Sequence, residues 1–288
     1  MASDARRVGV VGCGLMGSGI VEVVARAGVA VTVVEADGDA ARRGRERLER
    51  SLRRAVAAGK LAEQELAPVL GRVEVASSLA ALSTCELVVE AVAEDEGLKC
   101  SVFAELDRVL ASSEAVLASN TSSIPIARLA AATARPERVV GMHFFNPVPV
   151  MGLVELVPCL STSEGTIERA DAFARDVLSK RVVRSVDRAG FVVNALLVPY
   201  LLAAVRMVES GLASVEDVDA AMRAGCAHPM GPLELADFIG LDTVKSIADV
   251  LYAELRDSAC VAPALLSRMV ESGRLGRKSG RGFYEHGG

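Results

Sequence analysis

Residues 7–35 read RVGVVGCGLMGSGIVEVVARAGVAVTVVE. The first five residues have the apolar character of a buried strand, and glycines follow at positions 12, 14 and 17. Apolar residues then recur at helical spacing up to Gly28, and a second apolar strand at 31–34 leads into Glu35. Strand, glycine turn, helix, strand and acidic residue in this order are typical of the first unit of a dinucleotide-binding sheet.

Each part of this stretch has a physical role in holding a dinucleotide. The first glycine permits the tight turn, the second lets the backbone approach a pyrophosphate, and the third lets helix pack on strand. The pyrophosphate would lie at the helix N-terminus, where backbone N–H groups favour an anion. The expected cofactor contacts in this turn are Gly12, Gly14, Leu15, Met16 and Gly17. Glu35 would bind the adenosine ribose and repel a 2′-phosphate, which favours NAD over NADP; a purely structural glycine turn is the alternative.

The remaining pattern divides the chain into two domains. Further strands are predicted at 73–76, 87–92, 115–118 and 182–186, and helices at 39–70, 98–110 and 163–178, the last with Ser161 and Glu164 spaced as a capping box. This alternation predicts an α/β domain over residues 1–187, with a Rossmann-type, doubly wound, mostly parallel sheet. Residues 188–288 predict an all-α C-terminal domain, with helices at 191–209, 215–224, 232–238, 242–257 and 263–272 that end at Gly211, Gly225 and Gly273.

Composition and charge exclude several classes of protein. Hydrophobic residues make up 51% of the chain, and the formal charge of −5 argues against a nucleic-acid partner. The six cysteines show no CxxC spacing, so we expect reduced thiols, no metal site and a cytoplasmic location. The longest apolar run, 191–205, is too short to span a bilayer. No membrane association is therefore expected.

Residues 138–156 read RVVGMHFFNPVPVMGLVEL and hold the first candidate catalytic pair. Two apolar strands flank a proline-rich turn at 146–149, which can bring His143 and Glu155 within hydrogen-bond reach. A carboxylate on one imidazole nitrogen fixes the tautomer and stabilises the imidazolium, while the other nitrogen takes and returns a proton. The alternative is a core histidine beside a carboxylate that faces solvent.

Other polar residues follow predicted strands. Glu90, Glu94 and Lys99 lie at a strand end and the next helix entry, where ligands of open parallel sheets bind. The segment 119–126, SNTSSIPI, places small hydroxyls such as that of Ser122 near a substrate oxygen, or else caps the next helix.

The chain also offers a basic helix and an apolar helical domain. Seven arginines between residues 42 and 54 form either a solvated helix face or a cationic rim for substrate phosphates. The Leu, Val and Ala content after residue 188 predicts a homodimer through the C-terminal helices. Asn194 is a polar residue deep in an apolar helix, so it needs a partner, for which a substrate carbonyl or Ser122 is a candidate.

Seven segments together carry a family resemblance that covers essentially the whole chain. They are, in order, GCGLMGSGI, VVEAVAED, SNTSSIPI, HFFNPVPVMGLVE, GFVVNALLVPYL, HPMGPLELADFIGLD and GRKSGRGFY. The chain thereby resembles the L-3-hydroxyacyl-CoA dehydrogenase family, in particular its bacterial short-chain members. The resemblance implies an NAD-binding Rossmann domain, a helical dimerisation domain and a site between them. It also implies oxidation of (S)-3-hydroxybutyryl-CoA, an acyl-CoA thioester, to acetoacetyl-CoA or the reverse.

The same resemblance implies roles for individual residues. His143 would be the general base and Glu155 would orient and charge it, while Ser122 and Asn194 would bind the oxygen on C3 or the thioester carbonyl. The implied contacts of the NAD nicotinamide half are Glu90, Lys99, Ser122 and Asn146, and we add Glu94 and Asn120 from the same strand ends to the expected cofactor contacts. The chain departs from the common family pattern at Ala189, Ala195 and His228. These departures bear on the acyl pocket and hence on chain length.

Several alternatives stay open from the sequence. β-Hydroxyacid dehydrogenases share the glycine loop but use a catalytic lysine, and residues 190–194 contain none. Sugar-acid dehydrogenases of the crystallin-like branch have a different turn after the histidine. An acyl group carried by a protein would present the same phosphopantetheine arm as coenzyme A. A non-enzymatic, crystallin-like structural role is the remaining alternative.

Overall fold

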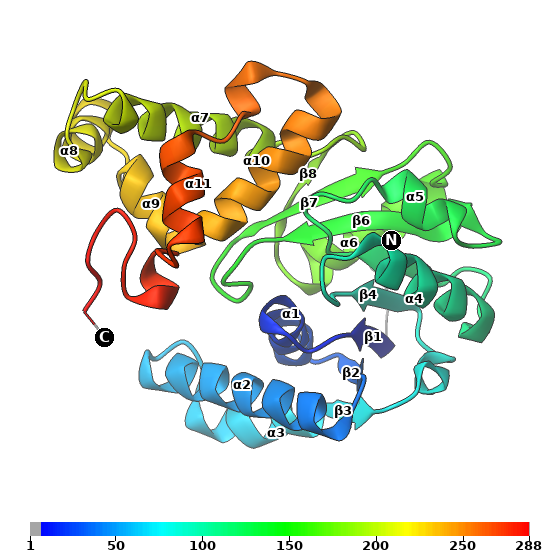
Figure 1. Cartoon of the computed structure of the whole chain (residues 1–288). Helices are drawn as coiled ribbons and strands as arrows, with labels where there is room; N and C mark the ends of the chain where they lie inside the picture. Colours follow the sequence, from blue (N-terminus) through cyan, green and yellow to red (C-terminus); the bar gives the residue numbers. More distant parts are fainter. Residues whose placement is uncertain (1–6, 288) are drawn as a thin grey trace. The chain divides into compact units, whose positions relative to one another are not determined.

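The structure, a computed structural model, describes residues 7–287. The chain divides into two compact units, Met1–Arg188 (unit 1) and Ala189–Gly288 (unit 2), each with its own apolar core (Figure 1). No helix within the described residues is both long and apolar enough to cross a membrane.

Unit 1 is built on an eight-stranded sheet in the described residues. Its strands are β1 (Arg7–Val11), β2 (Ala30–Val34), β3 (Val73–Ala76), β4 (Leu87–Glu90), β5 (Val116–Ser119), β6 (Val139–Phe144), β7 (Leu153–Pro158) and β8 (Arg181–Arg184). They lie in the order β3-β2-β1-β4-β5-β6-β7-β8, and neighbours are parallel apart from the antiparallel pair β6–β7. The predicted doubly wound, mostly parallel sheet is confirmed.

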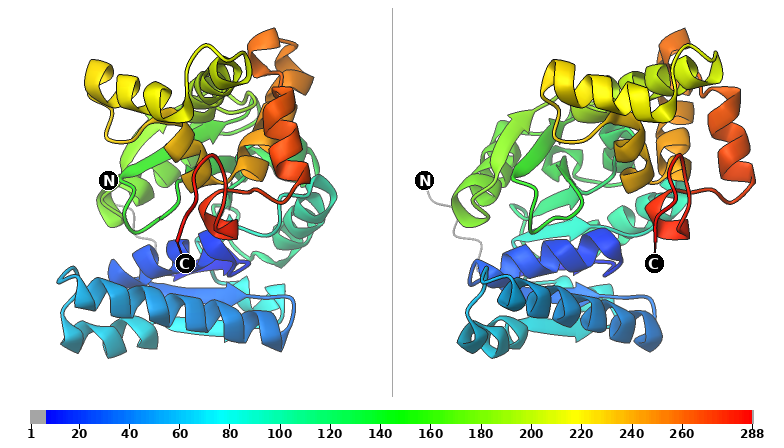
Figure 2. Two further views of the ribbon diagram at one scale, coloured as in Figure 1. Left: turned by 60° about the vertical axis from the view of Figure 1, so that its left-hand side comes forward. Right: turned by 90° about the vertical axis from the view of Figure 1, so that its left-hand side faces the viewer.

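Helices cover both faces of this sheet. They are α1 (Leu15–Arg26), α2 (Gly38–Ala57), η1 (Glu63–Glu65), α3 (Leu66–Gly71), η2 (Leu79–Leu82), α4 (Glu96–Val109), α5 (Ile126–Ala131), η3 (Pro136–Arg138), α6 (Glu164–Ala172) and the π-helical turn η4 (Phe173–Val177). One apolar cluster joins α1, α2, α3 and α6 to Val8 and Val10 of the sheet. Because side chains alternate between faces, Gly9 and Gly141 face the other way, against Leu82 of η2 and Ile126 of α5. Helices α2 and α3 lie side by side (Figure 2).

Two predictions for the helices of unit 1 were wrong. The predicted helix 39–70 breaks after Ala57, where Gly59 adopts a left-handed φ of 66°, and helix resumes at η1 and α3. The N-cap of α6 is Ser163, whose hydroxyl accepts from the amide of Thr166 at 3.2 Å, and not Ser161.

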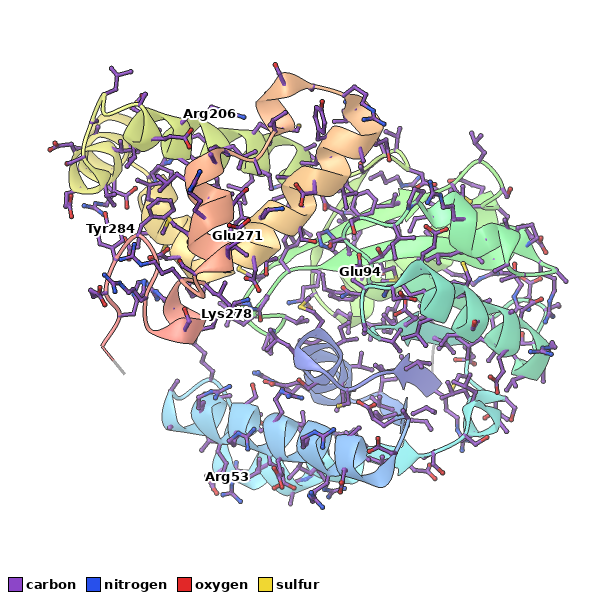
Figure 3. All side chains as sticks on the ribbon, in the orientation of Figure 1. Arg53, Glu94, Arg206, Glu271, Lys278 and Tyr284 are labelled. Carbon is purple, nitrogen blue, oxygen red and sulfur yellow. The ribbon has the colours of Figure 1, made fainter. Side chains whose placement is uncertain are left out.

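Unit 2 is the predicted all-helical part of the chain. Its helices are α7 (Val193–Glu209), α8 (Val215–Cys226), α9 (Pro232–Ile239), α10 (Leu241–Leu255), η5 (Ser258–Cys260), α11 (Ala264–Glu271) and η6 (Arg277–Ser279). Two buried carboxylates organise it. Asp219 accepts hydrogen bonds from the first amides of α9 and, at 2.8 Å, from the hydroxyl of Tyr284, which is labelled in Figure 3. Asp237 accepts a hydrogen bond from the amide of Phe283 and contacts His286.

The predicted end of α8 was also wrong. The helix continues through Gly225, and the left-handed residue that ends it is Ala227, with φ 56° and ψ 32°. A side chain with a Cβ is disfavoured in this conformation, which glycine adopts freely.

We expect Ala227→Gly to raise the free energy of unfolding by about 1 kcal/mol, because it removes the Cβ penalty of the left-handed conformation. Ala224→Gly, at an exposed interior position of the same helix, is the control and should lower it by about 1 kcal/mol. Urea unfolding followed by circular dichroism measures both. An equal loss of unfolding free energy in the two variants would contradict the left-handed conformation of Ala227 at the end of α8.

Candidate active site

The glycine turn between β1 and α1 requires its glycines. Gly12 has a left-handed φ of 89°, and a Cβ there would meet the carbonyl oxygen of Ala91 at 2.8 Å. A Cβ on Gly17 would collide with the carbonyl oxygen of Gly12, whereas the space beside Gly14 is open. The turn is therefore closely packed at its first and third glycines, with room for a ligand at the second.

The surroundings of this turn fit the two ends of an NAD adenosine diphosphate. Helix α1 has no side-chain cap at its N-terminus, so its first amides are available to a pyrophosphate. Glu35, directly after β2, accepts a hydrogen bond from the amide of Cys13, so its carboxylate lies beside the glycine turn; its contact with the adenosine ribose stays a prediction. Arg47 of α2 donates to the carbonyl of Cys13 at 2.9 Å and fixes the turn from the other side.

The thiol of Cys13 lies inside this turn and is not poised to react. Burial raises its pKa to about 11, and the nearby carboxylate of Glu35 acts in the same direction, against a smaller lowering by Arg47. The thiol therefore stays protonated at neutral pH, and a protonated thiol is a weak nucleophile.

The antiparallel pairing of β6 with β7 brings His143 and Glu155 together. The two residues are directly opposite in the register, and Nδ1 of His143 lies 2.8 Å from Oε2 of Glu155. His143 is 6% exposed and Glu155 is fully buried. A buried carboxylate bound to one ring nitrogen stabilises the imidazolium and directs proton transfer to the other nitrogen. The contact has the geometry that the predicted roles require, with His143 as general base and Glu155 as the carboxylate that orients it; these roles stay predictions.

Asn120 fixes the backbone next to this pair. Ser119, the last residue of β5, pairs with Gly141 of β6, so the segment after β5 runs beside the end of β6. The side-chain oxygen of Asn120 accepts from the amide of Phe144 at 2.9 Å, one residue past the histidine. The ring of Phe145 packs against the imidazole with centroids 4.5 Å apart.

Glu94, which is labelled in Figure 3, binds the hydroxyl-rich segment that contains Ser122. Its Oε1 accepts from the hydroxyl of Thr121 at 2.6 Å, the amide of Ser122 at 3.0 Å, and the amide and hydroxyl of Ser123 at 3.2 and 2.9 Å. Partial burial raises the pKa of Glu94, but the ammonium of Lys99 and these hydrogen bonds outweigh it, so the pKa lies below its ordinary value. The ionised carboxylate thus holds the segment in place.

Beneath Glu94 lies a buried ionic cluster. The ammonium of Lys99 is 2.6 Å from Oε1 of Glu90 and 3.3 Å from Oε2 of Glu94. The other oxygen of Glu90 accepts from the hydroxyl of Ser119 at 2.7 Å. Glu90 and Lys99 are at most 1% exposed, and buried charges of this kind persist only when paired. They hold the ends of β4 and β5; their direct contact with NAD stays a prediction.

The segment 119–126 does not cap α5. The first two amides of that helix, of Ile126 and Ala127, are bound by the carboxylate of Asp187 at 2.7 and 2.8 Å. The hydroxyls of residues 121–123 point instead to the Glu94 carboxylate, that of Ser122 at 3.5 Å; a contact of Ser122 with the substrate stays a prediction.

The structure gives the following positions for the remaining predicted residues. Asn194 is buried near the start of α7, in unit 2, and Asn146 is exposed in the turn after β6.

Arginines of α2 form exposed ion pairs along the helix, such as Arg45 with Glu49, which favours the solvated-face interpretation. Among residues 7–287, no group of three or more His, Cys, Asp or Glu side chains could hold a metal ion.

Two residues that hold elements of unit 1 in place were not found from the sequence. Lys180 donates to two carbonyls of the turn between β6 and β7, and Asp187 caps α5. Nothing in the sequence marks Lys180, because its acceptors are main-chain atoms.

Comparison with known proteins fits this geometry. The model of the 3-hydroxyacyl-CoA dehydrogenase NAD binding domain matches residues 7–188, and that of the 3-hydroxyacyl-CoA dehydrogenase C-terminal domain matches residues 190–286. The chain belongs to the 3-hydroxyacyl-CoA dehydrogenase family. The family, the fold, the enzyme class and NAD as cofactor, all predicted from the sequence, are thereby confirmed.

Individual relatives of this dehydrogenase are similar over nine tenths or more of their length. A 3-hydroxybutyryl-CoA dehydrogenase of Mycobacterium tuberculosis is 58% identical over 99% of the chain and 100% of the relative. The mitochondrial hydroxyacyl-coenzyme A dehydrogenase of Sus scrofa is 41% identical over 98% of the chain and 91% of the relative. The crystal structure of (S)-3-hydroxybutyryl-CoA dehydrogenase from Ralstonia eutropha is 41% identical, with a TM-score of 0.93 over 99% of this chain and 100% of that one.

The lowered pKa of Glu94 predicts an acid-dependent loss of stability. A carboxyl whose pKa is lower in the folded state stabilises the fold above its unfolded value, and this stabilisation disappears as the pH falls through the folded pKa. We therefore expect Glu94→Gln to lower the midpoint of thermal unfolding at pH 7, with a difference from wild type that shrinks below pH about 4.5. Glu105→Gln, exposed on α4, is the control. If the difference in unfolding midpoint between wild type and Glu94→Gln stays constant from pH 7 to 3, the charge of Glu94 does not stabilise the fold.

Proposed function

We propose that this dehydrogenase oxidises (S)-3-hydroxybutyryl-CoA to acetoacetyl-CoA with NAD, and catalyses the reverse reaction. The observation that carries the proposal is the buried His143–Glu155 contact of 2.8 Å at the carboxyl end of β6, in the unit that carries the glycine turn. The substrate follows from the relatives named above, among which 3-hydroxybutyryl-CoA dehydrogenases match over the full chain.

In the proposed mechanism, Nε2 of His143 takes the proton of the substrate hydroxyl as the hydride leaves C3. NAD, when bound, supplies the hydride acceptor. The carboxylate of Glu155 holds Nδ1 protonated and stabilises the imidazolium that forms. A general base of this kind contributes roughly 10²–10⁴-fold to the rate. In the reverse reaction the same imidazolium returns the proton to the C3 oxygen.

Ser122 and Asn194 are proposed to bind the C3 oxygen or the thioester carbonyl. The Ser122 proposal is supported by the way Glu94 holds its amide at 3.0 Å, because a fixed backbone limits where the hydroxyl can point. Asn194 is buried at the start of an apolar helix, where its amide group needs polar partners.

We expect His143→Gln to lower kcat by about 10²- to 10⁴-fold, because the variant loses the general base, while the affinity for NADH stays unchanged. The assay is oxidation of NADH at 340 nm with acetoacetyl-CoA, with NADH binding followed separately by fluorescence. Unaltered turnover in this variant would remove His143 from the mechanism.

The same assay with NADPH tests Glu35. We expect much slower turnover of NADPH, because the carboxylate repels a 2′-phosphate, and a preference for NADPH would contradict this role. Wild-type protein that binds NADH but reduces no free acetoacetyl-CoA would instead indicate a substrate on a carrier protein, or a non-enzymatic role.

We further propose that the enzyme is a homodimer through unit 2 and works in the cytoplasm. Leu196 and Met207 project from one face of α7 and are 72% and 45% exposed. Positions 196 and 207 are eleven residues, three helical turns, apart, so they lie on one stripe. Exposed apolar stripes of this kind favour burial in a partner.

Leu196→Glu should convert the dimer into a monomer, because it places a charge in the proposed apolar contact. Leu160→Glu, at a fully exposed leucine in unit 1, is the matched control and should leave the mass unchanged. Sedimentation equilibrium measures both. A monomeric wild type would contradict the dimer.

A further inference from the structure

The turn that joins β6 to β7, the two strands that carry His143 and Glu155, is held in place by residues outside this hairpin. Residues 145–152, here named the pair turn, join Phe144 of β6 to Leu153 of β7. Inside it, the carbonyl of Pro147 accepts from the amides of Val150 and Met151 at 2.9 and 3.0 Å. These local bonds shape the turn but do not attach it to the rest of unit 1.

Lys180 supplies such an attachment. Its ammonium donates to the carbonyl of Val148 at 2.7 Å and to that of Met151 at 2.6 Å, and the residue is 9% exposed. Among the described residues it forms no ion pair, so these carbonyls replace a carboxylate as its partners. Burial, and then Arg26, lower its pKa. Charge-assisted hydrogen bonds in a poorly hydrated place are among the stronger ones in proteins.

The backbone around Lys180 is arranged to present it. The residue before it, Ser179, has a left-handed φ of 53°, which turns the chain after η4 and starts β8. The amide of Lys180 donates to Ala174, and the amide of Arg181 donates to Gly152, the last residue of the pair turn. The side chain and the following amide thus both reach the same turn.

The other side of the pair turn rests on α1. Val148 is 2% exposed, and a Cβ on Gly19 of α1 would lie 2.9 Å from its Cβ. Helix α1 is the one that begins at the glycine turn. The pair turn is therefore fixed between the dinucleotide helix and Lys180.

The register of β6 and β7 depends on this turn. His143 and Glu155 are directly opposite, one pair from the Phe144–Val154 pair that borders the turn. A shift by one residue would move one of the two side chains to the other face of the sheet. We propose that Lys180 is a positioning residue that keeps His143 and Glu155 in contact by holding the carbonyls of Val148 and Met151. This inference rests on the proposed function for its effect on turnover.

The test compares Lys180→Met, which keeps most of the apolar stem and removes the donors, with Arg181→Met. Arg181 is the exposed neighbour whose side chain makes no hydrogen bond or ion pair among the described residues. For Lys180→Met we expect kcat for NADH oxidation by acetoacetyl-CoA to fall about 10- to 100-fold, as for a misplaced catalytic group, with the affinity for NADH unchanged. Arg181→Met should keep the wild-type kcat.

Hydrogen exchange gives a readout that needs no activity. In Lys180→Met the amides of Val150 and Met151 should exchange about tenfold faster or more, because the turn opens locally, and they should keep the wild-type rate in Arg181→Met. Unchanged exchange would overturn the attachment, and faster exchange with unchanged kcat would overturn the positioning role. If wild type itself shows no turnover, the proposed function fails, whereas the exchange result still decides whether Lys180 holds the turn.

Gly19→Ala provides a second variant in case Lys180→Met folds poorly. The added methyl group presses on Val148 from α1, so we expect the same fall in kcat and the same faster exchange at Val150 and Met151. An effect confined to NADH binding would show that the pair turn is not supported by α1 and would overturn this part of the inference.

Discussion

The antiparallel pairing of β6 with β7 is the constraint on which the proposed chemistry depends. The rest of the sheet is parallel, and a parallel neighbour would have required a long crossover between His143 and its carboxylate. Reversal through a short turn instead places Glu155 opposite the histidine, in a strand that is buried along most of its length. The carboxylate is thereby desolvated and kept beside the imidazole, which makes its charge effective.

Around this pair the polar groups form a connected series along the strand ends. Asn120 binds the amide after the histidine, Glu94 holds residues 121–123, and Lys99 joins Glu94 to the buried Glu90. Each ionised group has partners that offset the cost of its burial. These groups lie where β4 and β5 end, at the edge of the sheet where ligands bind in such folds.

The sequence predicted those features that depend on local pattern. The glycine turn, the alternation of strands and helices, and the reach of His143 to Glu155 all follow from residues that are near in the chain or repeat with a regular period. The break after Ala57 was missed although Gly59 and Lys60 interrupt the apolar stripe of Leu48, Leu52 and Val56 and a glycine is a typical helix end. Lys180 and Asp187 were missed because their partners are backbone atoms 29 to 61 residues away, and a backbone atom leaves no trace in the sequence.

The acceptors of Lys180 are backbone carbonyls, and this affects how the amino-acid sequence of the pair turn can vary. Every residue carries a carbonyl, so the two hydrogen bonds place no demand on which side chains stand at positions 148 and 151. Val150 and Met151 point outward and are 63% and 41% exposed. The surface of the turn is thus free to change, through substitution at 150 and 151, while the spacing of the strands beneath it stays constant.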